Sequence, residues 1–215
     1  MPVFKKKFYS ILFFLLSSFL VNGQTYDFNI LTTYSVNRTD DNKIERNVFS
    51  NKLNNSYFLE LSRYNNKSKA RLIDLISQKI HNFEVVETEN KNNVKKYNFN
   101  YIDSQDQFTY VTVPIVYYDY KIIESDSVYK EIELTFYKNK RKKKISSVHE
   151  LKLRINDFNL FPTFRFSCFH LIGFNPELNI VENGIIESGF VKSEESKVTY
   201  NLTHFEEVDF KLIVN

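Results

Sequence analysis

The 215-residue chain contains one cysteine, four glycines, four prolines and no tryptophan. With Cys168 as the single thiol, the chain cannot form an internal disulfide, so its stability must come from a hydrophobic core. Four glycines are too few for the glycine-rich loops that cradle phosphates, and the P-loop, GxGxxG and GxSxG motifs are absent from the sequence. The scarcity of glycine and proline also excludes collagen-like and low-complexity composition.

Histidine is also scarce, and the sequence lacks the HxH, HExxH and paired-cysteine spacings that hold metals. The four histidines are His81, His149, His170 and His204. Residues 40–42 resemble a turn, because the twelve-residue calcium-loop pattern is missing around them. We therefore expect no cofactor, no metal site and no assigned catalytic residue. A hydrolase with dispersed carboxylates is kept as an alternative, since such pairs need not be close in sequence.

The N-terminus has the layout of a secretory signal peptide. Lysines occupy residues 5–7, and residues 8–21 form an uncharged stretch rich in Phe and Leu. Val21 and Gly23 stand at the −3 and −1 positions of a cleavage site before Gln24. The stretch is short for a transmembrane helix, which needs about 20 residues. We expect residues 1–23 to be removed, leaving an exported protein of the periplasm or cell surface without a transmembrane span. An uncleaved anchor is the alternative.

Removal of that leader changes the charge of the protein. Residues 1–23 hold three of the 29 basic side chains and none of the 26 acidic ones, so the remaining chain has no net charge. A global field that would attract nucleic acid or an anionic membrane is therefore absent. We expect no nucleic-acid partner, and any electrostatic attraction must be local.

One local concentration of charge is the stretch YKNKRKKKIS at residues 137–146. It lies between two segments of alternating apolar and polar residues, which predicts a solvated hairpin tip. The alternative is contact with an anionic envelope component, such as lipopolysaccharide or an acidic partner. The residues that would make this contact are Lys140, Arg141, Lys142, Lys143 and Lys144.

The apolar pattern has a period of two along nearly the whole chain, with short polar turns between segments. This predicts an all-β, mostly antiparallel domain over residues 24–215, with about ten to thirteen strands and at most one or two short helices. A half-barrel, a barrel and a sandwich all fit this pattern. Residues 69–87 fit either a helix or a hairpin, and we favour the hairpin. Residues 163–174 are predicted to form an apolar strand, and Asn183–Gly184 a hairpin turn.

The last segment places His204 and Glu206 on the same strand face, because alternate residues of a strand point the same way. A polar pair on a core face needs partners, so these residues are candidates for a ligand-binding patch. A β-bulge at residues 205–208 would instead turn Phe205 inward and both glutamates outward, and we favour such a structural explanation. Cys168 and His170 would also share a strand face, but no third group is present to orient a catalytic dyad.

Two aromatic runs allow a second interpretation besides core packing. Residues 110–123 and 161–174 are rich in Tyr and Phe, and would suit a concave apolar surface that accepts a lipid. Tyr117, Tyr118 and Tyr120 would give that surface both apolar rings and polar hydroxyls. Core packing is favoured, because a β domain without disulfides needs these rings in its core.

A signal peptide followed by a long β-rich chain with short polar turns resembles uncharacterised exported proteins of Gram-negative bacteria. In strand number the chain is also similar to the half-barrel of periplasmic lipoprotein carriers. The resemblance extends over residues 24–215 and carries over no functional residue. Our leading hypothesis is a non-enzymatic β domain that binds or scaffolds at the cell envelope, with an envelope component as partner. A periplasmic carrier of a hydrophobic ligand is the alternative.

Overall fold

The computed structural model describes residues 23–38, 43–64, 67–89, 95–106, 115–192 and 198–214. Residues 1–22 of the expected signal peptide lie outside these ranges. The described strands are β1 (Gln24–Asn37), β2 (Lys43–Ser50), β3 (Tyr57–Tyr64), β4 (Lys67–Asp74), β5 (Lys79–Glu89), β6 (Lys95–Asp106), β7 (Tyr117–Ser125), β8 (Tyr129–Tyr137), β9 (Ile145–Ile155), β10 (Gly184–Lys192) and β11 (Thr199–Val214). The described helices are α2 (Phe161–Cys168) and the 3-10 helix η1 (His170–Phe174). The predicted all-β class with short helices is confirmed.

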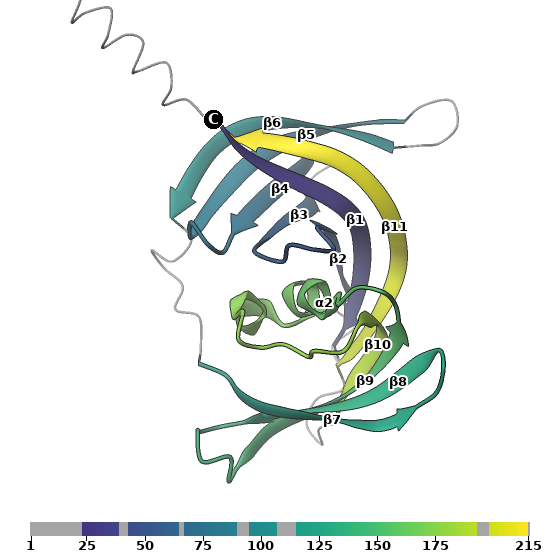
Figure 1. The fold of residues 1–215 in the computed structure, drawn as a ribbon. Coiled ribbons are helices and arrows are strands. Elements are labelled where there is room, and N and C mark those ends of the chain that lie inside the picture. The colour runs from purple at the N-terminus through teal and green to yellow at the C-terminus, as the bar shows by residue number, and fades with distance from the viewer. Residues whose placement is uncertain are drawn as a thin grey trace, which may run out of the picture.

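All these strands belong to one antiparallel sheet, in the order β6-β5-β4-β3-β2-β1-β11-β10-β9-β8-β7. Because the first strand pairs with the last, both lie at the centre of the sheet. The two edges, β6 and β7, are consecutive in the chain and are not paired with each other. The result is a strongly curled open sheet of the half-barrel type, in which β1 and β11 bend together (Figure 1).

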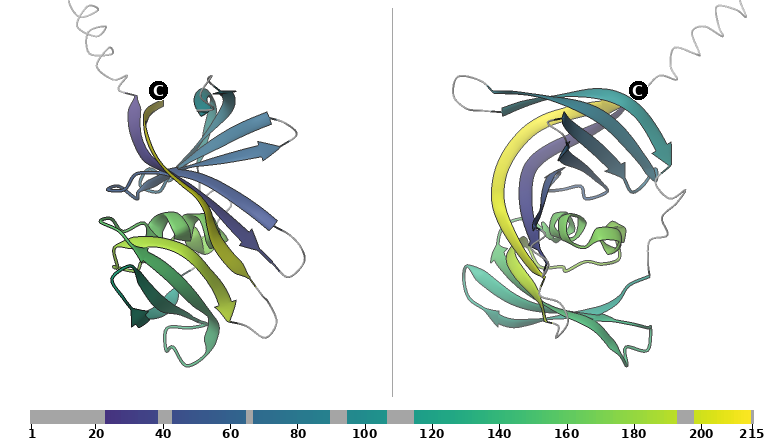
Figure 2. Two further views of the ribbon diagram at one scale, coloured as in Figure 1. Left: turned by 90° about the vertical axis from the view of Figure 1, so that its right-hand side faces the viewer. Right: turned by 180° about the vertical axis from the view of Figure 1, so that it is seen from behind.

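The bend in β1 and β11 divides the sheet into two lobes, seen from three sides in Figures 1 and 2. The N-terminal lobe contains β2–β6 and the C-terminal lobe contains β7–β10, and β1 and β11 run through both lobes. Helix α2 and η1 lie between the two lobes.

The N-terminal lobe curls around its own core. Phe99 of β6 stacks on Phe210 of β11 with ring centroids 5.5 Å apart, although these strands are not paired. The lobe is therefore closed by side chains where hydrogen bonds are missing. The buried core residues are Tyr26, Phe28, Leu31, Phe49, Tyr57, Leu59, Ala70, Leu72, Phe83, Val85, Leu212 and Val214.

In the C-terminal lobe, α2 fills the concave face of the sheet. Phe164 of the helix packs edge-on against Tyr34 of β1 and Tyr200 of β11, at centroid distances of 5.4 and 5.5 Å. Phe136 of β8 and Phe169 extend the same cluster, with their centroids 5.7 Å apart. The burial of this helix therefore supplies the core that a single curved layer of sheet could not make alone.

The middle strands of the N-terminal lobe are buried on both faces. In β3, Tyr57 and Leu59 point into the lobe, whereas Phe58 points out toward the helix. Phe58 stacks on Phe166 of α2 with a centroid distance of 4.5 Å. Since successive side chains of a strand alternate between faces, one short segment can serve two cores. This second contact fixes the helix against both lobes.

The predicted strand at residues 163–174 is wrong, because these residues form most of α2 and all of η1. Phe161 to Ser167 are all buried, so the segment has no solvent-facing side and shows no diagnostic period. Pro162 stands in the first turn, where the missing N–H leaves no hydrogen bond unmade. Cys168 and His170 therefore do not share a strand face. Burial raises the pKa of the Cys168 thiol, which fits an inert core residue.

The predicted hairpin turn at Asn183–Gly184 is also wrong, because residues 177–183 form no strand and Gly184 begins β10. Gly184 has φ of 154°, and an added Cβ would lie 2.5 Å from the Arg154 carbonyl oxygen. Its N–H donates to the Phe158 carbonyl oxygen, and its own carbonyl accepts from the Leu160 N–H. The glycine is thus required where the chain enters the sheet beside the start of α2.

The hairpin preferred for residues 69–87 is confirmed by β4 and β5. Its turn is held by Asp74, whose Oδ1 accepts the N–H groups of Ile76 and Ser77 at 2.8 and 3.0 Å. Tyr26 donates its hydroxyl to Oδ2 at 2.9 Å. Burial alone would raise the pKa of Asp74, but these hydrogen bonds hold it below the usual value. The turn is therefore fixed by a carboxylate that stays ionised.

Candidate functional site

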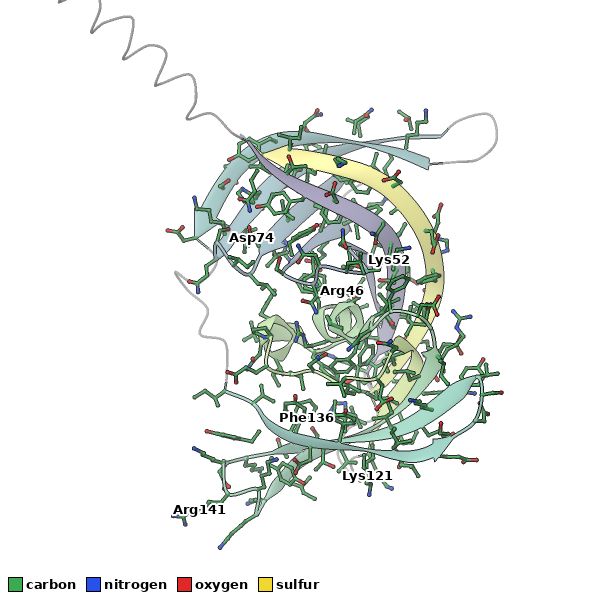
Figure 3. The ribbon with its side chains drawn as sticks, in the orientation of Figure 1. Arg46, Lys52, Asp74, Lys121, Phe136 and Arg141 are labelled. Atoms are coloured by element: carbon green, nitrogen blue, oxygen red, sulfur yellow. The ribbon has the colours of Figure 1, made fainter. Side chains whose placement is uncertain are left out.

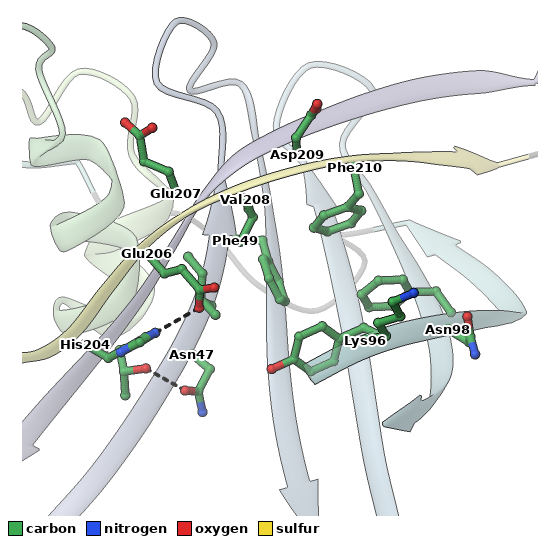
Figure 4. A pocket seen from close by; sticks show the side chains of 14 residues that line it. Asn47, Phe49, Lys96, Asn98, His204, Glu206, Glu207, Val208, Asp209 and Phe210 are labelled. Carbon is green, nitrogen blue, oxygen red and sulfur yellow. Dashed lines mark hydrogen bonds and ion pairs between the residues drawn. The ribbon is translucent and has the colours of Figure 1, made fainter. Parts of the chain in front are cut away.

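An open groove of about 780 Å³ lies in the N-terminal lobe, between β6 on one side and β1, β2 and β11 on the other (Figure 4). It forms because β6 curls toward β11 without pairing with it. The lining residues are Leu31, Thr33, Asn47, Phe49, Lys96, Tyr97, Asn98, Phe99, His204, Glu206, Glu207, Val208, Asp209 and Phe210.

The floor of the groove is aromatic. Phe49 and Phe210 meet edge-on with centroids 5.1 Å apart, and Phe49 and Tyr97 meet in the same way at 5.4 Å. Phe99 stacks on Phe210 and belongs to the same cluster. These rings pack onto the core of the N-terminal lobe, so the groove is an opening onto that core. An apolar molecule would contact rings already held in place by their neighbours.

The rim of the groove is polar. His204 Nε2 and Glu206 Oε2 lie 3.2 Å apart, and both side chains are 52% exposed. Across the strand pair, Thr33 donates its hydroxyl to Asn47 Oδ1 at 2.7 Å. The Lys96 side chain also lies at the groove, whereas the carboxylates of residues 207 and 209 point to the opposite face of β11 (Figure 4). This arrangement can hydrogen-bond the polar end of a bound molecule at the mouth of the groove.

Two irregularities in the pairing of β11 with β1 place these side chains. Thr203 is an extra residue between the pairs Thr33–His204 and Tyr34–Leu202. A second irregularity places residues 208 and 209 opposite Asn29. Residues 204–207 pair regularly between these two irregularities, so the expected bulge is displaced to residues 208 and 209. Phe205 packs onto a core cluster with Ile30, as expected, but Glu206 does not turn outward. His204 and Glu206 consequently face the groove instead of the helix.

A second hollow of about 590 Å³ adjoins the groove and shares Asn47 and Tyr97 with it. It opens where β2 and β3 separate, because these strands pair only through residues 47–49 and 59–61. Figure 2 shows the strands of this lobe fanning apart. Burial, together with the charges of Glu87 and Glu206, raises the pKa of Tyr97. A neutral tyrosine hydroxyl therefore lies between the two hollows.

The second hollow contains a charged network. Glu60 is buried and accepts hydrogen bonds from the guanidinium groups of Arg46 and Arg71. Burial would raise the pKa of Glu60, but the two arginines outweigh it and lower that pKa. Arg63 pairs with Glu87 at 2.5 Å. Sequence reasoning missed this network, because the residues become neighbours only through strand register.

The structure does not bring the predicted ligand-binding residues together. Tyr117, Tyr118 and Tyr120 lie on β7 at the far edge of the C-terminal lobe, whereas the His204–Glu206 pair lies in the N-terminal lobe. Tyr118 and Tyr120 pack against the core of their own lobe. The Tyr118 hydroxyl is used internally, since it accepts the Asn179 N–H at 3.0 Å and donates to a backbone carbonyl. Tyr118 and Tyr120 thus have a structural role.

The basic stretch forms the turn between β8 and β9, and Figure 3 shows Arg141 at its tip. The solvated hairpin tip is confirmed, with one exception. Lys142 has φ of 53°, forms an ion pair with Asp119 and donates to the Tyr118 carbonyl oxygen at 3.0 Å. The exposed cations that remain for an external contact are Lys140, Arg141, Lys143 and Lys144.

Comparisons with known proteins give little guidance. No family model and no curated protein matches the chain. Among solved structures, a LolA superfamily protein from Nitrosomonas europaea aligns with 86% of this chain and 87% of its own, at 9% identity and a TM-score of 0.20. In the described part of the chain, no helix is long and apolar enough to cross a membrane. The same residues contain no cluster of three metal-ligating side chains of the His, Cys, Asp or Glu type.

Proposed function

We propose that this protein is a non-catalytic binding protein of the cell envelope that holds an apolar or amphipathic ligand in the groove of its N-terminal lobe. The observation that carries the proposal is the groove itself. Its volume of about 780 Å³ lies within the roughly 300–1,000 Å³ of known small-molecule sites. The apolar part of the ligand would lie on Phe49, Phe99 and Phe210, and its polar end would reach His204 and Glu206.

A carrier function follows from the openness of the site. Ligand pockets combine an apolar lining with a few placed polar groups, and this groove has the aromatic rings at its floor and the polar groups at its mouth. A ligand held in this way can leave without unfolding the lobe. With export through the expected signal peptide, the ligand would be a lipid or another hydrophobic molecule of the periplasm.

Hydrolysis is the competing function for the same groove, because His204 and Glu206 form a hydrogen-bonded pair at its rim. The pair is half exposed, however, so water competes with any substrate for its hydrogen bonds. The nearest hydroxyl in register, that of Thr33, donates to Asn47 instead of His204. An activated nucleophile needs a hydrogen bond to its base, so this geometry favours binding over covalent catalysis.

Native mass spectrometry of the protein purified from the periplasm, with a denatured sample beside it, tests the proposal first. We expect an additional mass that is lost on denaturation. The binding site is then located with Thr33→Trp, which places a large ring in the groove, and Ile213→Trp as the matched control. Ile213 is on the same strand pair but is 61% exposed and points away from the core.

The affinity of the released ligand is measured by its displacement of an apolar fluorescent probe. This affinity should fall at least tenfold in Thr33→Trp and remain unchanged in Ile213→Trp. A bare protein mass, together with equal probe binding by both variants and the wild type, would contradict the carrier function. A scaffold at the envelope would then be the better account.

A further inference from the structure

The charge of Arg165 lies in the interior of the protein. This residue is in the middle of α2, between the two lobes, and is 2% exposed. Burial lowers the pKa of Arg165 to about 10, so its guanidinium group remains charged at neutral pH. A buried charge without a counter-charge destabilises a fold by several kcal/mol, and such groups are normally paired.

Arg165 has no such pairing. In the described part of the chain it forms no ion pair, and its single hydrogen bond runs from Nη1 to the Leu178 carbonyl oxygen at 2.6 Å. Glu60, another buried ionic group, contrasts with it, since that carboxylate has two arginine partners. Among the described residues, Arg165 is thus a buried cation without a counter-charge.

The unused part of the guanidinium group has a definite shape. Nη1 is taken by Leu178, and the opposite edge carries Nε and Nη2. Nε is buried and has no partner, and no bond of Nη2 is found among the described residues. Two parallel N–H groups on one edge match the two oxygens of a carboxylate or phosphate. A single backbone carbonyl could be bound equally well by a simpler side chain.

A second unsatisfied polar group lies on the segment that carries the Leu178 carbonyl. The Oδ1 atom of Asn179 is buried without a hydrogen-bond partner, next to the Leu178 carbonyl that Arg165 binds. The amide can turn to present its Nδ2 donor instead. The Tyr118 hydroxyl holds the Asn179 backbone through hydrogen bonds of 2.9 and 3.0 Å, which fixes the segment that carries the Leu178 carbonyl.

We propose that Arg165 is the receptor for one oxyanion, a carboxylate or a phosphate group, bound between α2 and the segment at residues 175–180. The Nε–Nη2 edge binds two of its oxygens. The anion neutralises the buried charge and joins the helix to the segment that closes the C-terminal lobe. Free phosphate and the head group of an amphiphile share this chemistry. The site is separate from the groove of the N-terminal lobe.

The experiment measures thermal unfolding of the purified protein in an uncharged buffer at constant ionic strength, with sodium phosphate, acetate or octanoate added. We expect saturable stabilisation, with a rise in Tm of about 5–10 °C at a hundredfold excess over Kd. Phosphate and acetate acting alone would identify a free-ion site, whereas octanoate acting alone would identify the head group of an amphiphile.

Arg165→Met removes the charge and keeps an unbranched apolar side chain, and should abolish the Tm response to the anion. Arg165→Lys retains the charge without the two-pronged edge, and should bind at least tenfold more weakly. Arg141→Met, at the exposed hairpin tip, is the matched control and should respond like the wild type. A wild-type Tm that no anion raises would overturn the proposal, as would an equal response in Arg165→Lys. Both outcomes are measured on the wild type and Arg165→Lys, so they can be obtained even if Arg165→Met does not fold.

Discussion

The two lobes of this protein use the same strongly bent sheet in different ways. In the C-terminal lobe the concave face is filled by α2, whose Phe161 and Phe164 are fully buried. In the N-terminal lobe the sheet curls on itself, and Phe99 meets Phe210 across a gap that no strand pairing closes. One concave face is thus filled by the chain itself, and the other is left open as a groove.

This difference shows that one part of a single sheet can stabilise the fold while another part remains open to a ligand. A face covered by a helix buries its aromatic rings completely, whereas an open face leaves rings such as Phe210 half-buried and available to a ligand. Because α2 also packs on the outer side of β2–β4 through Phe166, the closed lobe supports the open one. Changes in the helix should therefore affect the whole molecule, and changes in the groove should remain local.

The largest expected effect is a difference in stability loss between substitutions in the cores of the two lobes. Phe164→Ala removes a fully buried ring that contacts Tyr34 and Tyr200, and should lower the free energy of unfolding by about 3–5 kcal/mol. Phe210→Ala, at the groove floor, should lower it by about 1–2 kcal/mol, because that ring is already partly in water. Urea denaturation measures both. Equal losses would mean that the open lobe is as tightly packed as the closed one.

The second effect concerns acid stability. His149 is buried among Phe136, Phe169 and Tyr200, and burial lowers its pKa to about 4. The unfolded chain binds the proton below pH 6.5 and the folded chain only near pH 4. Stability should therefore fall by about 1.4 kcal/mol per pH unit between these values, through this residue.

His149→Phe should flatten that part of the profile, measured as the urea midpoint from pH 7 to pH 4. His204→Gln in the open groove is the control, since its side chain is 52% exposed. If the urea midpoint of His149→Phe still falls as in the wild type between pH 7 and pH 4, another group, such as buried His81, dominates the loss of stability.

A smaller effect compares ion pairs. Glu60→Gln leaves Arg46 and Arg71 without their shared carboxylate, and should cost about 1–2 kcal/mol of stability, since both arginines can still reach water. Glu133→Gln breaks the exposed pair with Lys121 and should leave the thermal midpoint unchanged. The labelled Arg46 and Lys121 lie in different lobes in Figure 3. Equal midpoints for the two variants would mean that the buried network is merely tolerated.

The smallest effect on stability is expected at the hairpin tip. Changing Lys140, Arg141, Lys143 and Lys144 to Ser should leave folding intact, because these side chains are exposed. If the tip contacts an anionic envelope component, the same change should abolish retention on heparin at low salt. Lys142 is kept, because it is tied to Asp119. Unchanged retention would reduce the tip to a solvated turn.

Some features of this protein were determined by the sequence alone. The period of two predicts strands, and the polar clusters predict where they turn, because these are local properties of the chain. The hairpin of β4 and β5 and the basic tip between β8 and β9 follow from such signals. The polar pair His204 and Glu206 could also be found in this way, since alternation places both on one face.

Other features were decided only by the tertiary structure. Helix α2 is buried on all sides, so its formation follows from the need to fill a concave face and not from a local period. The groove depends on β6 meeting β11 without pairing, and the Glu60 network depends on strand register. Arg165 is one basic residue among phenylalanines in the sequence. Its burial without a counter-charge arises only when α2 is packed between the lobes, because long-range contacts determine which charges lose their water.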